Sequence, residues 1–345
     1  MIYPLRFEKV FIKKIWGGRA LETELGMTLP ENEIIGESWE VSAHSNGMSI
    51  VENGELKGKT LQEVYDTYKS ELVGEKVYEE YGHLFPLLIK YLDINDRLSI
   101  QVHPEDEQAM KKHNELGKSE SWYVIEASDD AKLILGMAEG ITKDQFVTKA
   151  KANDFSDMFK VKSVKAGDLI DINPGTVHAS LEGSILIAEI QENSDITYRI
   201  YDFDREENGI KRELHIDEAA ETIDFSKDVD VVSTIFNEGE TKKKKKIKKK
   251  KKIKILKKKK KKDKKKKKKK KKKYYTIEKI KITSELEDIN NGSMIIYSVL
   301  DGAGKLEWGT DYKECLEIHK GESLLVPVNV KVKLNGNIEI LRTTI

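Results

Sequence analysis

The sequence predicts a mainly β protein, an antiparallel sandwich or barrel, with helical insertions. Short apolar runs alternate with Gly, Asn and Pro turns along most of the first 225 residues. This spacing is typical of antiparallel sandwiches and barrels. With 345 residues, 38% apolar content, four Trp and thirteen Tyr, the chain is long enough to form two or more cores.

Strands are expected from the N-terminus onward. Residues 1–58 contain runs such as "IIGESWEVSAHSNGMSIVENG", in which apolar residues are joined by Gly and Asn turns, and they predict sheet. Five later runs predict further strands: "SESWYVIEA", "AKLILGM", "GDLIDINPG", "GSILIAEIQENS" and "DITYRIYDFD".

Three segments predict helices. In "TLQEVYDTYKSELVGEKVYEEYG", Thr60 followed three residues later by Glu63 forms a capping-box pattern that opens a helix. A second helix is expected from Thr142 in "TKDQFVTKAKANDFSDMF", and a third in "HIDEAAETIDF", near residues 215–225. These helices interrupt the β pattern rather than replace it.

Composition excludes several classes of protein. No apolar stretch approaches the about 18 residues of a membrane span, and the N-terminus lacks the apolar core of a secretory signal, so a cytoplasmic location is expected. Cys315 is the single cysteine, which excludes an internal disulfide and a thiolate metal cage. Any metal must therefore be held by His, carboxylate or amide oxygen.

Residues 242–273 form a poly-lysine tract that holds 27 Lys and one Asp. The rest of the chain has 34 basic and 59 acidic residues, a net charge of −25. Such a tract cannot bury apolar surface, so a solvated insertion is expected. Binding to nucleic acid or anionic lipid is one interpretation, but no Arg or aromatic residue interleaves with the lysines. We therefore prefer a passive expansion.

A faint internal repeat indicates a duplicated β unit. "KAGDLIDINPGTVHAS" and "HKGESLLVPVNVKVKL" share a Gly, an acidic residue, an apolar run and a Pro. The first copy continues to His178, whereas the second continues through Val328 and Val330 without a ligand-type residue. The first unit is therefore expected to hold a site, and the second one to pack.

Four polar residues could hold a divalent ion. In "LSIQVHPEDEQAM", strand alternation puts Gln101 and His103 on one face; Glu120 lies at a strand start, and His178 follows the turn "NPGTVH". Two imidazoles, a carboxylate and an amide oxygen suit Zn²⁺ with an open position. Each residue also has an ordinary structural interpretation, a hydrogen-bonded His or a solvent-facing Glu, and spacing alone does not decide.

Several ordered motifs then match a family. "VFIKKIWGG", "GESWEVSAH", "SIQVHP", "GKSESWY", "PGTVHA", "EIQENSDITYRIYDFDR" and "KRELHI" together resemble the type I mannose-6-phosphate isomerases, zinc-dependent members of the cupin superfamily, and in particular their short bacterial form. The resemblance covers most of residues 1–225 and, more weakly, "GAGKL" and "KGESLLVPVNV" near the end. The poly-lysine tract departs from the family pattern.

The resemblance implies two cupin-type antiparallel β-barrel (jelly-roll) units. They are a catalytic domain at residues 1–225, with helical insertions, and a metal-free β domain at 274–345, separated by the insertion at 242–273. It also implies one zinc ion per chain, with ligands from Gln101, His103, Glu120 and His178.

The implied reaction interconverts D-mannose 6-phosphate and D-fructose 6-phosphate through a cis-enediol. Arg199 would lie in the active site, with Lys118 and Glu189 nearby, and positive charge there would stabilise the enediolate. Glu189, Lys118, a metal-bound hydroxide or a neutral His could each be the base. The structural alternatives are an ion pair of Arg199 with Asp202 or Glu189, and an exposed loop position for Lys118.

Substrate phosphate needs cationic donors, because no Gly-rich phosphate loop occurs in the sequence. Lys90 and Arg199 are the candidates, although Lys90 could equally be a snorkelling lysine at a strand end. No membrane partner is expected, nucleic acid is disfavoured, and a monomer is favoured. The rival functions are a non-enzymatic bicupin that binds sugar or metal, and an isomerase of another phosphorylated sugar.

Overall fold

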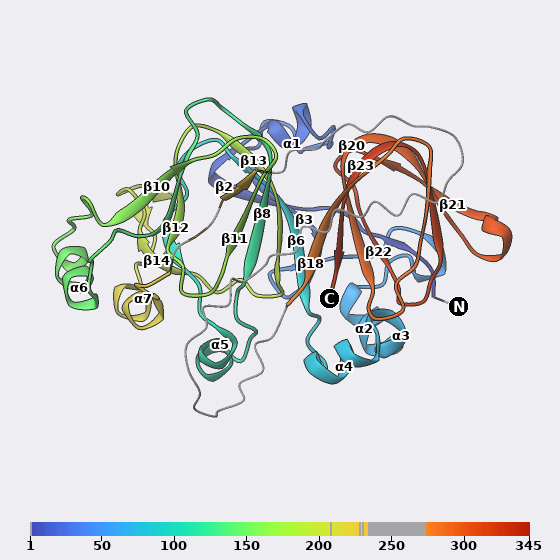
Figure 1. Cartoon of the computed structure of the whole chain (residues 1–345), viewed down its shortest axis with the longest axis horizontal. Helices are drawn as coiled ribbons and strands as arrows, with labels where there is room; N and C mark the ends of the chain where they lie inside the picture. Colours follow the sequence, from blue (N-terminus) through green and yellow to red (C-terminus); the bar gives the residue numbers. More distant parts are fainter. Residues whose placement is uncertain (1, 208, 228, 230, 234–273) are drawn as a thin grey trace. The chain divides into compact units, whose positions relative to one another are not determined.

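The computed structural model describes residues 2–207, 209–227, 229, 231–233 and 274–345 (Figure 1). The chain divides into two compact units. The central unit comprises Phe7–Glu63 and Leu84–Asn237, and the terminal unit comprises Met1–Arg6, Val64–His83 and Glu238–Ile345. Residues 64–83, which the sequence placed in the catalytic domain, thus cluster with the C-terminal strands. The poly-lysine tract lies outside the described residues.

The central unit is built on two large antiparallel sheets, beside the two-stranded pairs β4 (Ala43–His44) with β5 (Gly47–Met48) and β15 (Glu206–Glu207) with β16 (Ile210–Lys211). The seven-stranded sheet has the order β17 (Val231–Ser233), β11 (Asp168–Ile172), β8 (Glu120–Ala127), β13 (Ile185–Glu192), β6 (Leu87–Ile94), β3 (Ile35–Val41) and β2 (Val10–Gly18). The five-stranded sheet has the order β10 (Phe159–Ser163), β9 (Lys132–Met137), β12 (His178–Glu182), β7 (Ile100–Val102) and β14 (Tyr198–Tyr201).

One apolar core joins the inner faces of these two sheets. It takes Leu133 and Leu135 from the five-stranded sheet and Trp122, Val124 and Ile187 from the seven-stranded sheet. All five side chains are buried, so the sheets pack face to face. The described strands form open sheets, and the closed barrels expected from the sequence are not found among them.

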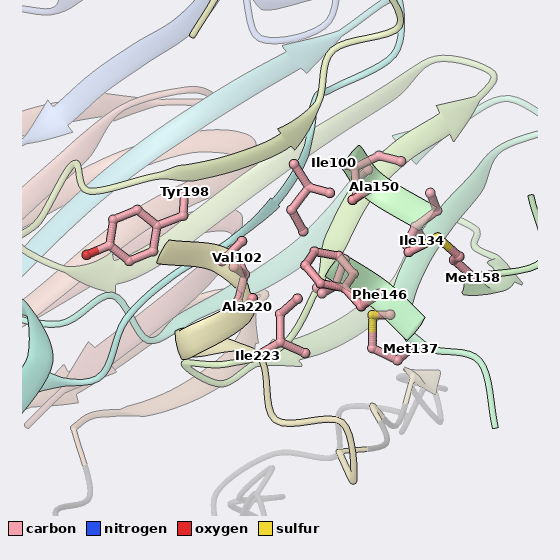
Figure 2. Close-up of a cluster of buried hydrophobic side chains, with 14 of the residues drawn as sticks. Ile100, Val102, Ile134, Met137, Phe146, Ala150, Met158, Tyr198, Ala220 and Ile223 are labelled. Atoms are coloured by element: carbon pink, nitrogen blue, oxygen red, sulfur yellow. The ribbon is translucent and has the colours of Figure 1, made fainter. Parts of the chain in front are cut away.

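A second core covers the outer face of the five-stranded sheet. Phe146 of α6 (Lys143–Lys151) and Ala220 of α7 (Ile216–Thr222) pack there against Ile100 and Val102 of β7 (Figure 2). Figure 1 shows both helices on the outer side of β10, β12 and β14. Because Ile100 and Val102 face outward, strand alternation turns Gln101 inward.

The predicted helix starts are confirmed, and one predicted helix is broken. Thr60 and Glu63 form the expected capping box, and so do Thr142 and Gln145. The segment after Thr60 forms three short helices, α2 (Leu61–Tyr68), α3 (Ser70–Val73) and α4 (Glu75–Tyr81). Lys69 (φ 46°) and Gly74 (φ 101°) have left-handed backbones, which end each preceding helix.

The terminal unit is built on one antiparallel sheet. The main path runs through β1 (Leu5–Arg6), β22 (Ser323–Val326), β20 (Ile295–Trp308), β23 (Val332–Thr344) and β18 (Thr276–Ile282). β19 (Glu285–Asp288) joins β23, and β21 (Glu314–His319) joins β20. Within the described parts of the chain, no helix has the length and apolarity needed to cross a membrane.

Candidate functional site

The predicted ligands Gln101 and His178 are cross-strand partners in the five-stranded sheet. β12 pairs with β7 through His178 and Gln101, and β14 pairs with β7 through Arg199 and Gln101. Directly opposed residues point to the same face of a sheet, so these three side chains form a row on the inner face. His103 follows β7 immediately.

Glu120 completes a buried cluster with the two histidines. It begins β8, and its oxygens lie 3.6 Å from Nε2 of His103 and 3.1 Å from Nε2 of His178. The ligand atoms of the three residues all lie within 4.8 Å of one another. Both Glu120 oxygens are buried, and neither accepts a hydrogen bond of good geometry from the described residues. A carboxylate in that condition suits a metal ion.

Backbone carbonyls orient both imidazoles towards the cluster. Nδ1 of His103 lies 2.8 Å from the carbonyl oxygen of Ile196, and Nδ1 of His178 lies 3.0 Å from that of Thr176. A carbonyl can only accept, so each Nδ1 carries the proton and each Nε2 presents a lone pair to the cluster. This is the usual support of metal-binding histidines.

Gln101 reaches the same cluster through its amide. Its Nε2 lies 3.2 Å from Nε2 of His178, and Ser99 donates a hydrogen bond to its Oε1. A half-turn of this terminal amide brings its oxygen to the cluster, and the Ser99 hydroxyl can then accept from the amide nitrogen. The structure therefore brings together all four predicted ligands.

The protonation states within the cluster suit metal binding. Burial, with the Lys118 charge adding to it, holds the pKa of His103 well below its usual range, so the imidazole is neutral. Burial would raise the pKa of Glu120, but Lys118, His103 and His178 outweigh it and hold that pKa well below its usual range. A neutral imidazole and an ionised carboxylate are the forms that bind a cation.

Lys118 and Glu189 both border the cluster, as predicted. Nζ of Lys118 lies 3.1 Å from Oε2 of Glu120 and 3.3 Å from Nε2 of His103, and the side chain is buried rather than exposed in a loop. Burial would lower the pKa of Lys118, but Glu120, Glu189 and Asp195 raise it above its usual value. Lys118 therefore stays an ammonium.

Glu189 tends towards its uncharged form, whereas Lys118 keeps its charge. Trp122 donates from Nε1 to Oε1 of Glu189 at 2.7 Å. Burial, together with the charge of Glu120, raises the pKa of Glu189 to about 8. Cross-strand pairing puts Glu189 between Trp122 on β8 and Lys90 on β6, so the carboxyl group is held on the inner face.

Lys90 is buried among acidic side chains. Its Nζ lies 3.4 Å from Glu37, 3.9 Å from Glu189 and 3.9 Å from Asp195, and 4.4 Å from the centre of the Trp39 ring. Two ionised carboxylates, Glu37 and Asp195, and the Glu189 carboxyl group already surround the ammonium, and the two ionised groups repel a phosphate dianion. These surroundings do not favour the predicted phosphate contact, and they exclude a snorkelling lysine because the side chain is only 3% exposed.

Sequence reasoning missed Glu37, Trp39 and Asp195. Trp39 donates from Nε1 to Glu37 at 2.6 Å, and Lys14 lies 3.2 Å from the same carboxylate. Glu37 and Trp39 stand two residues apart in "GESWE", the spacing that puts both on one strand face. That spacing was the available signal; only the fold shows that the face is the interior.

Glu37 predicts an acid-dependent loss of stability. Burial would raise its pKa, but Lys90 and Lys14 outweigh burial and lower it to about 2, from 4.5. The folded-state pKa lies below the unfolded-state value, so the stabilisation is present above pH 4.5 and is lost as the pH falls towards 2. At pH 7 it amounts to about 3 kcal/mol.

Denaturation in urea at pH 7 and pH 3 measures this effect. The wild-type protein should exceed Glu37→Gln in unfolding free energy at pH 7, and somewhat more than half of the gap should disappear by pH 3. The exposed Glu55→Gln variant is the control. A gap that stays the same at both pH values would contradict the assignment.

Arg199 lies half-buried beside Gln101, and no carboxylate among the described residues forms an ion pair with it. One guanidinium nitrogen donates to the carbonyl oxygen of Glu213 at 3.0 Å, while Nε–H is buried without a described partner. Burial, with the nearby charge of Arg212, lowers the pKa of Arg199 from its usual value. An unpaired guanidinium on the inner face is suited to bind an anionic substrate.

The alternative ion pair of Arg199 with Asp202 is wrong. Asp202 instead binds Arg205 at 2.8 Å and Nε of Arg212 at 2.7 Å. The other suggested partner, Glu189, forms no ion pair with Arg199 either. Asp202 thus neutralises its neighbours and leaves Arg199 unpaired.

A hollow of about 490 Å³ lies elsewhere on the central unit. It is lined by Lys112, His113, Ile196, Thr197, Tyr198, His215 and Glu218. Tyr198 faces the outer core, whereas its neighbour Arg199 faces inward, so this hollow lies on the opposite face of β14 from the ligand cluster. We therefore place the chemistry at the ligand cluster.

In the terminal unit, buried polar side chains bind one another. Arg342 donates to Glu278 at 3.0 Å and also binds Asp288, while the hydroxyl of Tyr297 donates to Asp288 at 2.7 Å. The second repeat copy carries Val328, which is buried. In the described part of this unit, His, Cys, Asp and Glu side chains form no group of three that could hold a metal.

Comparison with known proteins gives matches along both units. Residues 5–127 match the family model "Phosphomannose isomerase type I, catalytic domain", and residues 265–345 match "Mannose-6-phosphate isomerase, cupin domain". A mannose-6-phosphate isomerase of Streptococcus mutans is 34% identical over 343 residues, 99% of this chain and 98% of that protein.

Solved structures agree with these matches. The crystal structure of the mannose 6-phosphate isomerase from Bacillus subtilis has a TM-score of 0.79 at 30% identity, covering 100% of both chains. A zinc-bound mannose 6-phosphate isomerase structure has a TM-score of 0.71 at 15% identity, covering 99% of each chain, a likeness of fold. The chain therefore belongs to the mannose-6-phosphate isomerase family and is an aldose–ketose isomerase with a mainly β, cupin-type fold.

Proposed function

We propose that this protein is a zinc-dependent enzyme that interconverts D-mannose 6-phosphate and D-fructose 6-phosphate through a cis-enediol. The observation that carries the proposal is the buried cluster of His103, Glu120 and His178, with ligand atoms within 4.8 Å. The name of the Streptococcus mutans relative supports the substrate.

The residues present fit one zinc ion per chain. Two Nε2 lone pairs, an ionised carboxylate without a good hydrogen bond and the Gln101 amide form a mixed nitrogen and oxygen donor set. Catalytic zinc sites use such ligands and keep a position open. When bound, zinc supplies a Lewis acid that polarises the sugar oxygens.

Glu189 is the base that we propose for moving the proton between C2 and C1. Its Oε1 is fixed by Trp122, and its carboxyl group stands on the inner face beside Lys90. Lys118 is an ammonium in contact with Glu120, so it suits charge stabilisation rather than proton abstraction. The Nε2 atoms of the two histidines face the ligand cluster, which leaves neither imidazole free to act as the base.

Arg199 would bind the anionic parts of the substrate. Its buried Nε–H is available for the enediolate or for the phosphate, and no described carboxylate forms an ion pair with its guanidinium. We infer that it is both a catalytic and a substrate-binding residue.

We also assign each unit a cupin-type jelly roll, the central one catalytic and the terminal one metal-free. The facing sheets of the central unit and the cupin-domain match at residues 265–345 support this assignment. The ion-paired interior of the terminal unit is consistent with a packing role. A cytoplasmic location and a monomeric state stay predictions.

A coupled assay for fructose 6-phosphate tests the proposal on the full chain. Turnover of mannose 6-phosphate is expected, with loss of nearly all activity after chelation and recovery on addition of zinc. Glucose 6-phosphate serves as the matched phosphorylated sugar. Zinc binding without turnover of either sugar would favour the non-enzymatic bicupin, and turnover of glucose 6-phosphate alone would favour an isomerase of another sugar.

A further inference from the structure

A short hairpin is packed against the indole of Trp39. It consists of β4 (Ala43–His44), the turn Ser45–Asn46 and β5 (Gly47–Met48). A Cβ added at Gly47 would lie 2.5 Å from the Trp39 ring, so the backbone lies directly on the indole. His44 meets the same indole edge-on, with ring centres 6.0 Å apart. The two residues that flank the turn are therefore both packed on the indole.

Asn46 binds this turn to the 193–197 loop, which contacts His103. Its Nδ2 donates to Oδ2 of Asp195 at 3.0 Å. The next residue, Ile196, has the carbonyl oxygen that accepts from Nδ1 of His103. Lys90 connects the same two parts, because its Nζ lies 3.9 Å from Asp195 and 4.4 Å from the centre of the Trp39 ring. The position of Asn46 is thus linked to that of a ligand imidazole.

His44 extends from the same hairpin towards the loop that leads into β8. The backbone N–H of Asn46 donates to Nδ1 of His44 at 3.1 Å, so in the neutral ring Nε2 carries the proton. That Nε2 lies 3.5 Å from Oε2 of Glu115, a buried oxygen without a well-formed hydrogen bond. Glu115 opens the segment that carries Lys118 and Glu120.

We propose that the turn between β4 and β5 is a strap that holds the two loops flanking the metal ligands, with Asn46 and His44 as positioning residues for isomerisation. The inference rests on the proposed function, because it concerns the same site. Loops open locally more readily than core strands, and misplacing a functional group by about 1 Å can cost about a hundredfold in rate. The hydrogen bond of Asn46 to Asp195 and the 3.5 Å contact of His44 with Glu115 counter that opening.

Hydrogen exchange on the full chain, without metal and with zinc added, tests the strap directly. Asn46→Ala should speed exchange of the Ile196 amide and its neighbours by about fivefold or more, because a charge-assisted hydrogen bond is lost. His44→Phe keeps the ring packing on Trp39 but removes the donor, and should speed exchange at Gly117 and Lys118. Each variant should lower kcat by about tenfold and leave KM nearly unchanged.

Asn335→Ala is the matched control, because Asn335 donates from Nδ2 to Glu307 at 2.7 Å within the terminal unit. It should change neither loop exchange nor kcat. Asn46→Asp should loosen the 193–197 loop more than Asn46→Ala, since it sets a second carboxylate against Asp195.

Unchanged exchange at 193–197 in Asn46→Ala would overturn the strap. Exchange in the metal-free protein does not depend on turnover, so this result is distinguishable from failure of the proposed function. In that second case the wild-type protein would lack zinc-dependent isomerase activity whether or not the loops are held.

Discussion

His178→Ala should remove most bound zinc and lower kcat/KM by at least about a thousandfold, the scale of losing a Lewis acid at the reacting oxygens. His178 is fully buried, its Nδ1 is held by the Thr176 carbonyl, and its Nε2 lies 3.1 Å from Glu120. Alanine cannot replace that donor, and it leaves Glu120 with less compensation for its charge. Zinc content by atomic absorption and steady-state kinetics measure the two effects.

His319→Ala is the matched control for this variant. His319 stands in the second copy of the internal repeat, is exposed, and lies 3.8 Å from Glu322. Its removal should leave zinc content and turnover unchanged. A fully metallated, active His178→Ala protein would remove His178 from the ligand set.

Arg199→Ala should keep its zinc and lose about a hundredfold in kcat, as expected for one preorganised charge-stabilising donor. Arg199 is the cross-strand neighbour of Gln101 but contacts none of the other proposed ligands. Zinc content should therefore distinguish Arg199→Ala, which keeps the metal, from His178→Ala, which loses it. Arg199→Lys should recover only part of the loss, because it restores a point charge without the planar set of donors.

Arg19→Ala provides the comparison for general effects of losing an arginine. Arg19 pairs with Glu22 at 2.6 Å on the surface of the same unit. It should have nearly wild-type kinetics. Unchanged turnover in Arg199→Ala would return Arg199 to a structural role.

Strand pattern made the ligand cluster a candidate, and the family resemblance selected its four members. Strand alternation turns Gln101 inward, and a turn followed by a strand puts His178 opposite it. The partners that tune the cluster could not be found in this way. Lys90 and Glu189 are 99 residues apart along the chain, and Trp122 lies between them, yet one cross-strand row joins all three. Only strand order and register determine that row.

The sequence indicates where helices begin more clearly than where they break. A capping box specifies a helix start, and Thr60 and Thr142 were read correctly. A break within such a helix is harder to predict. Lys69 has a left-handed backbone (φ 46°), and a lysine at that position does not indicate this conformation. The assignment of residues 64–83 to the terminal unit depends on tertiary contacts such as the hydrogen bond from Met294 N to the carbonyl of Val73.

The terminal unit takes its strands from both ends of the described chain, which has a consequence for the order of folding. β1 pairs with β22 through Leu5 and Leu325, and β23 is the neighbour of β18, β19 and β20. All strands of the central unit's two large sheets lie between Val10 and Ser233. On the ribosome the central unit can complete its two large sheets first. The terminal unit at that stage still lacks β23, with which β18, β19 and β20 all pair. β1 must therefore wait, unpaired, until β22 has been synthesised after the whole central unit, and this interval exposes the chain to aggregation.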